Sequence, residues 1–146
     1  MTGARASAFI DQWWRAEIAA IANNTCGRRA ADLGSGAGVL ANTVSEAFTT
    51  CGSPLNYLIC IDYSVHAVSA AAARLGVKAL VANLAALPIA DGAIDIALSQ
   101  YGIEYAGDNG IREAARIVAP GGVLLALLHD REGALAAECR DNLALF

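Results

Sequence analysis

Five short apolar segments recur along this chain, and stretches of helical periodicity lie between them. The apolar segments span residues 30–33, 57–61, 78–81, 94–98 and 123–128. Strands that are apolar along their whole length are typical of a parallel sheet with helices on both faces. The pattern therefore predicts an α/β fold built on a five-stranded parallel sheet.

The helical segments fit this arrangement. Large apolar residues between Phe9 and Ile21 recur at helical spacing, so an amphipathic helix is expected over residues 6–22, before the first strand. Further helices are predicted over residues 39–48, 64–75 (capped by Ser64), 111–118 and 134–145. We expect one domain over residues 1–146, with an N-terminal helix and cap in 1–28 and an α/β core in 29–146.

Composition excludes several classes of function. The net charge of −4 argues against a nucleic-acid-binding surface, which needs clustered Lys and Arg. No apolar run is long enough to span a membrane, and the N-terminus lacks the layout of a secretion signal, so a cytoplasmic protein is expected. The cysteines at 26, 51, 60 and 139 form no CxxC pair, so the sequence predicts no metal site and no disulfide framework.

A glycine-rich turn follows the first predicted strand, in residues 32–38 (DLGSGAG). Glycines at alternate positions tolerate positive φ and let a ligand lie close to the backbone. The dinucleotide fingerprint needs a third glycine at its sixth position, where this chain has Val39, and no Gly-Lys-Ser/Thr follows as in a P-loop. Asp32 would repel a phosphate and suits the ammonium group of an amino acid, so a ligand other than a dinucleotide is favoured.

Polar residues stand at the ends of four predicted strands. Ligands of parallel sheets bind beyond the carboxyl ends of the strands, where the strand order reverses. The candidates at these ends are Asp32, Asp62, Asn83 and the run Ser99, Gln100 and Tyr101. Asp62 has two readings, a carboxylate that accepts both hydroxyls of a ribose or a helix cap before Ser64. The glycine turn favours the ribose.

Five motifs in order resemble those of class I S-adenosylmethionine-dependent methyltransferases. Residues 32–38 resemble the first motif of that family, and Asp62 matches its acid after the second strand. Residues 81–88 resemble its adenine-contacting segment, 91–98 its fourth strand, and 119–124 its lead into the fifth. The resemblance covers nearly all of residues 30–128. It implies a Rossmann-like, doubly wound sheet in strand order 3-2-1-4-5, with helices on both faces and an extra N-terminal helix.

The resemblance also implies S-adenosylmethionine as the cofactor and assigns roles to individual positions. Asp32 would lie near the methionine ammonium, Asp62 would hold the ribose hydroxyls, and Asn83 would accept from the adenine amino group. The family usually has Asp where this chain has Asn83, so that contact would lack charge assistance. The full set of implied cofactor-binding residues is Asp32, Gly34, Ser35, Gly36, Gly38, Asp62, Tyr63, Asn83, Leu84, Ser99, Gln100 and Tyr101.

The implied reaction is an in-line displacement that transfers a methyl group to a small-molecule acceptor, without a metal. Glu104 is a candidate catalytic residue that could act as a general base or orient an acceptor amine; the alternative is a solvated loop acid. His129, next to Asp130, could deprotonate a hydroxyl; the alternative is a surface turn. The expected partners exclude nucleic acid and membranes.

Two other functions stay open. One is a non-catalytic subunit that binds S-adenosylmethionine or acts as a scaffold, and the other is an NAD-dependent oxidoreductase, which Val39 argues against. The family usually continues past the fifth strand into a helix and strands six and seven, whereas this sequence ends at Phe146. A fragment is therefore expected, and a second copy or a partner could cover the edge beside the fifth strand.

Overall fold

The structure is a computed structural model that describes residues 3–24, 28–130 and 133. Its strands are β1 (Arg29–Leu33), β2 (Tyr57–Asp62), β3 (Lys78–Val81), β4 (Ile94–Gln100) and β5 (Val118–Leu127). Its helices are α1 (Gly3–Asn24), α2 (Val39–Thr50), α3 (Val65–Leu75), the short 3-10 helix η1 (Ile103–Ala106) and α4 (Gly107–Ile117). All strand pairs are parallel and the sheet order is β3-β2-β1-β4-β5, which confirms the predicted topology.

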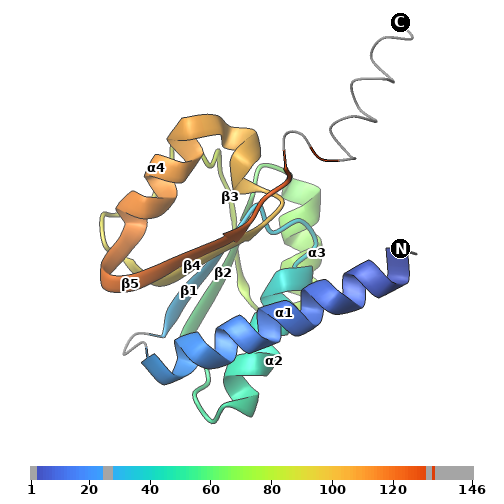
Figure 1. Ribbon diagram of the computed structural model, residues 1–146. Coiled ribbons are helices and arrows are strands. Elements are labelled where there is room, and N and C mark those ends of the chain that lie inside the picture. The colour runs from blue at the N-terminus through green and yellow to red at the C-terminus, as the bar shows by residue number, and fades with distance from the viewer. Residues whose placement is uncertain (1–2, 25–27, 131–132, 134–146) are drawn as a thin grey trace, which may run out of the picture.

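Helices cover both faces of the sheet. Helices α1, α2 and α3 lie on one face, and α4 lies on the other (Figure 1). Side chains alternate along each strand, so Ala30 of β1 joins the core under α2 while its neighbour Ala31 joins the core under α4. This burial on both sides is why the strands are apolar along their whole length.

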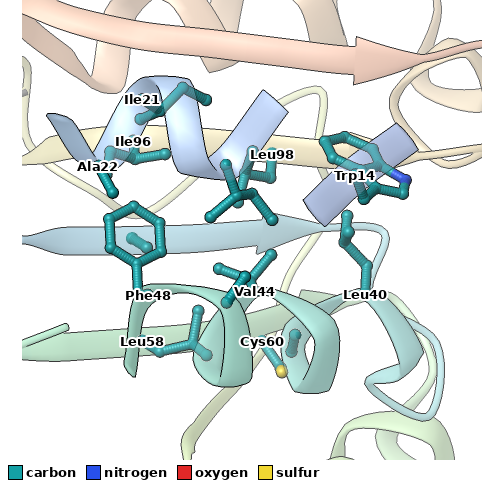
Figure 2. Close-up of a cluster of buried hydrophobic side chains, with 14 of the residues drawn as sticks. Trp14, Ile21, Ala22, Leu40, Val44, Phe48, Leu58, Cys60, Ile96 and Leu98 are labelled. Carbon is teal, nitrogen blue, oxygen red and sulfur yellow. The ribbon is translucent and has the colours of Figure 1, made fainter. Parts of the chain in front are cut away.

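The larger core lies between the sheet and helices α1 and α2. The side chains of Phe48 of α2 and Trp14 of α1 belong to this cluster (Figure 2). Phe48 is fully buried, and Trp14 and Ile18 of α1 are 1% and 0% exposed. Cys60 of β2 completes the cluster from the sheet side. Burying each large side chain contributes about 2–3 kcal/mol. The N-terminal helix is therefore an integral layer of the fold.

The largest differences from the predicted boundaries are at the starts of two elements: α4 begins at Gly107 instead of residue 111, and β5 begins at Val118 instead of residue 123. The segment containing Pro120 was expected to be a loop after the helix, but α4 ends at Ile117 and β5 begins directly at Val118. Val118 pairs with Ile94 and Val123 with Ile96, so the residues between them form an irregularity in the ladder. In the described sheet β5 pairs only with β4, and an edge strand tolerates a proline and a bulge.

Strand β4 is also longer than predicted and runs through Gln100, which places Ser99 within the strand.

Three sequence predictions concern residues that the structure does not describe, namely the helix over residues 134–145, Cys26 and Cys139. Within the described ranges, no group of three or more metal-ligating side chains is present. Among the helices that the structure describes, none is long and apolar enough to cross a bilayer.

Replacing Phe48 with Ala is expected to lower the free energy of unfolding by about 3–5 kcal/mol, because it leaves a cavity between α2 and the sheet. Urea denaturation measures the change. Val39→Ala, on the same helix but at a 66% exposed side chain, is the matched control and should change stability by less than about 0.5 kcal/mol. Similar losses in the two variants would contradict the assigned core.

Candidate functional site

A cleft opens at the carboxyl ends of the strands, where β1 and β4 lead to helices on opposite faces of the sheet. Its volume is about 360 Å³, within the range of small-molecule sites. Six predicted site residues line it, namely Gly34, Asp62, Tyr63, Asn83, Leu84 and Tyr101. Gly102, Tyr105 and Ala106 complete the lining. The other predicted cofactor-binding residues are not part of this lining, namely Asp32, Ser35, Gly36, Gly38, Ser99 and Gln100.

The first glycine of the turn is required by the protein's own packing. Gly34 has φ of 74°, and a Cβ there would lie 2.7 Å from the Cα of Gly102. The backbone after β1 is therefore in direct contact with the backbone after β4. The N–H groups of Gly34 and Ser35 both donate to the Ile61 carbonyl, at 2.8 and 3.0 Å, which fixes the turn against β2 as well.

The other two turn glycines differ in their surroundings. A Cβ on Gly38 would lie 3.0 Å from side-chain atoms of Ala71 and Leu75, so this glycine lets α2 approach α3. A Cβ on Gly36 would have no atom of the described residues within 4 Å. Gly36 is thus the turn glycine with open space beside it.

Asp62 joins the glycine turn to the end of β2. Its Oδ2 accepts a hydrogen bond from the Gly36 N–H at 2.8 Å, and its Oδ1 accepts from the Ser64 N–H at 2.9 Å. Ser64 is the N-cap of α3, because its hydroxyl accepts from the Ala67 N–H. The carboxylate is held at the cleft by two backbone donors and keeps further lone pairs for a ligand.

Asp32 is buried beneath the turn, at 1% exposure. Its Oδ2 accepts from the Ala41 N–H at 3.0 Å, while Oδ1 has no hydrogen-bond partner among the described residues. Burial raises the pKa of Asp32 to about 7; the Ala41 hydrogen bond opposes this shift, and the charge of Asp62 adds to it. A buried carboxylate oxygen without a hydrogen-bond partner lowers the stability of the folded chain when no ligand is bound.

Asn83 and Leu84 form the wall on the β3 side. The Asn83 side-chain oxygen accepts from the Ala85 N–H at 2.9 Å, which fixes the orientation of the amide. The Leu84 side chain is 9% exposed and packs with the core under α4. This wall combines a fixed amide with an apolar surface.

Ser99 and Gln100 are held by the protein itself and do not line the cleft. The fully buried Ser99 hydroxyl donates to the Leu33 carbonyl at 2.6 Å and accepts from the Ile103 N–H at 3.0 Å. The Gln100 side-chain oxygen accepts from the Trp14 indole N–H at 2.6 Å. Both residues fix the loop that follows β4.

That loop brings the two candidate catalytic residues together. Glu104 Oε1 lies 3.0 Å from His129 Nδ1 and accepts from the His129 backbone N–H at 3.2 Å. The Tyr101 ring stacks on the imidazole with centroids 4.1 Å apart, and the Tyr105 hydroxyl lies 3.3 Å from Nδ1. Tyr101 has φ of 57°, a left-handed conformation that is rare for a bulky residue and is often found at functional sites.

Sequence reasoning did not identify Gly102 and Ala106 as part of the site. In the sequence, Gly102 is only a glycine that follows the fourth strand. Its role was not predictable because it depends on contact with Gly34 across the sheet. Asp130 is the neighbour of His129 in the sequence, and no local pattern pairs the imidazole with Glu104. The structure brings Glu104, 25 positions away, to the imidazole.

Comparisons with known proteins agree with this architecture. The chain matches the methyltransferase domain family over residues 31–126. The structure of YcgJ from Bacillus subtilis aligns with a TM-score of 0.69 and 23% identity, covering 91% of this chain and 58% of that one. The trans-methyltransferase CalH in complex with SAH aligns at 0.68 and 17% identity, covering 80% and 38%.

An S-adenosylmethionine-dependent methyltransferase from Mesorhizobium loti aligns with a TM-score of 0.59 and 24% identity, covering 74% of this chain and 50% of that one. No curated protein matches the sequence. The chain thus belongs to the methyltransferase domain family. It spans only about half the length of the solved relatives, between 38% and 58%.

Two substitutions in the glycine turn should have different effects on stability. Gly34→Ala is expected to cost about 2–4 kcal/mol, because the new methyl group meets the Gly102 backbone and the φ is positive. Gly36→Ala should cost only about 1–2 kcal/mol, because its side faces open space. Urea denaturation compares them, and equal losses would contradict the backbone contact.

Replacing Asp32 with Asn should stabilise the protein increasingly as the pH rises from about 4.5 to 7.5. The folded-state pKa of Asp32 is about 7, above its ordinary value of 3.8, so between these pH values the folded protein keeps a proton that the unfolded chain has lost. The free energy of unfolding of the parent is therefore highest at low pH and falls as the pH rises towards 7. The gap between variant and parent should widen by on the order of 3 kcal/mol over this window.

Urea denaturation at several pH values measures this gap. Asp95→Asn is the control, because its ion pair with Arg29 lowers the carboxyl pKa to about 2 and keeps it ionised throughout the window. That variant should lose a roughly constant amount of stability. A gap for Asp32→Asn that does not change with pH would refute the assignment.

Proposed function

We propose that this chain binds S-adenosylmethionine in the cleft and transfers its methyl group to a small-molecule acceptor. The observation that carries the proposal is the hydrogen bond between Asp62 and the Gly36 N–H. This hydrogen bond joins the glycine turn to Asp62, which follows β2 and lines a cleft large enough for a small-molecule ligand. Membership of the methyltransferase domain family supports the same reading over the oxidoreductase alternative.

The residues present fit this cofactor. Asp62 can accept from ribose hydroxyls through the lone pairs that its two backbone donors leave free. The Asn83 oxygen keeps one lone pair for the adenine amino group, and Leu84 offers an apolar surface to the ring. The open space beside Gly36 suits close approach of a ligand to the backbone.

Asp32 fits as a counter-charge for the methionine ammonium group. Its Oδ1 is buried and has no hydrogen-bond partner within the described part of the chain. Because Asp32 does not line the cleft, we infer that a water molecule connects it to the ligand. A cation nearby would favour the ionised carboxylate, whose charge is otherwise costly in this buried position.

When bound, the cofactor supplies a methyl group on a good leaving group, so the protein's tasks are to orient the acceptor and to exclude water. The aromatic residues Tyr101 and Tyr105 line the cleft on the β4 side, where an acceptor could reach the methyl group. The volume of the cleft and the net charge of −4 favour a small molecule over nucleic acid.

Isothermal titration calorimetry tests the cofactor. The native chain should bind S-adenosylmethionine and not NAD, and Asp62→Asn should weaken binding about tenfold or more, because charge-assisted hydrogen bonds are lost. Asp91→Asn is the matched control, since it removes one exposed carboxylate away from the cleft lining. Absence of S-adenosylmethionine binding, or equal affinity in Asp62→Asn, would refute the proposal.

A further inference from the structure

We propose that His129, positioned by Glu104, is the general base of the methyl transfer, and that the acceptor carries a hydroxyl group on an aromatic ring. The inference rests on the proposed function and names the substrate class of the same cleft. It starts from the contacts among Tyr101, Glu104 and His129.

Glu104 fixes both the position and the protonation pattern of the imidazole. The same carboxylate oxygen accepts from the His129 backbone N–H at 3.2 Å and lies 3.0 Å from Nδ1. A carboxylate is a strong acceptor, so the imidazole proton resides on Nδ1 and the lone pair on Nε2. No hydrogen bond of the described residues occupies Nε2. The ring therefore presents a basic nitrogen.

Tyr105 offers Nδ1 a competing contact, which is weaker. Its hydroxyl lies 3.3 Å from Nδ1, farther than Glu104 Oε1, and a neutral phenol is a poorer acceptor than a carboxylate. Glu104 Oε2 is buried and has no hydrogen-bond partner in the described part of the chain, so within that part His129 is the hydrogen-bonding partner of this carboxylate. The carboxylate charge would stabilise the imidazolium that forms when His129 takes a proton.

The imidazole is also fixed next to the cleft. Tyr101 stacks on it with an interplanar angle of 24°, and the Tyr101 N–H donates to the Leu127 carbonyl at 2.8 Å. Tyr101 and Tyr105 both line the cleft and both contact His129. The His129 side chain is 31% exposed, so a molecule that enters from solvent can reach it.

The presence of a base points to a hydroxyl acceptor. A neutral amine attacks through its own lone pair, whereas a hydroxyl group is a poor nucleophile until it loses its proton. In the step we propose, the acceptor proton moves to His129 Nε2 as the acceptor oxygen forms a bond to the methyl carbon. The carbon–sulfur bond breaks and sulfur keeps its electron pair. His129 then releases the proton to water.

The lining of the cleft indicates the kind of hydroxyl. Tyr101 and Tyr105 are the aromatic residues of this lining on the β4 side, and Tyr105 is 75% exposed. Aromatic side chains favour stacked or edge-to-face contacts with flat aromatic ligands. The acceptor class is therefore a phenol.

The first test needs no cofactor. Long-range ¹H–¹⁵N NMR correlation at about pH 8.5, where imidazoles are neutral, identifies which ring nitrogen carries the proton. His129 should be the Nδ1–H tautomer in the native chain and revert to Nε2–H in Glu104→Ala. The exposed His66 on α3, the only other histidine, is the internal reference and should not change. An Nε2–H tautomer of His129 in the native chain would overturn the proposal.

The second test measures methylation of phenol and of nitrophenols that are ionised at the assay pH. His129→Asn should slow the reaction of phenol about 100-fold or more, but that of the ionised nitrophenols less than about threefold, because they need no base. Glu104→Ala should lower kcat for phenol in the same pattern and change its pH profile. His66→Asn is the control and should match the native chain.

Equal losses on both acceptors, or methylation of none of the phenols by a chain that binds S-adenosylmethionine, would overturn this inference and leave the proposed function standing. Absence of cofactor binding in the calorimetric titration would instead overturn the proposed function itself. The two failures are distinguishable because tautomer, binding and turnover are measured separately.

Discussion

The contact between Gly34 and Gly102 is the constraint on which the rest of the site depends. A methyl group at either position would meet backbone atoms within 3 Å, so neither position can carry a side chain. Here the chain turns from β1 to one face of the sheet and from β4 to the other, and the cleft opens between the two turns. Ser99 strengthens the junction because its hydroxyl bridges Leu33 and Ile103. Main-chain packing thus sets the shape of the cleft.

The same region also contains a buried carboxylate whose charge is unfavourable for folding. Asp32 is buried, one of its oxygens has no hydrogen-bond partner among the residues that the structure describes, and Asp62 adds a second negative charge nearby. By contrast, Asp95 is paired with Arg29, and Glu113 is paired with Arg116. Buried charge without a partner is seldom kept for stability, so its position beneath the glycine turn agrees with a role in ligand binding.

The sequence predicted the sheet well because wholly apolar strands and a glycine turn are local signals. Asp62 was predicted for the same reason, since it ends an apolar strand. The start of β5 was mispredicted because Pro120 and its glycines are typical of loops, yet an edge strand accommodates them as a bulge. Tyr101's positive φ and the Glu104–His129 contact depend on tertiary packing, which no short segment encodes.

The hydrogen bond from Trp14 to Gln100 gives the protein a built-in optical probe. Gln100 directly precedes Tyr101, and the two tryptophans of the chain are adjacent on α1, with ring centroids 4.9 Å apart. A shift in the loop after β4 changes the hydrogen bond of a buried indole, whose emission responds to its surroundings. Intrinsic fluorescence therefore monitors the loop that lines the cleft without any added label.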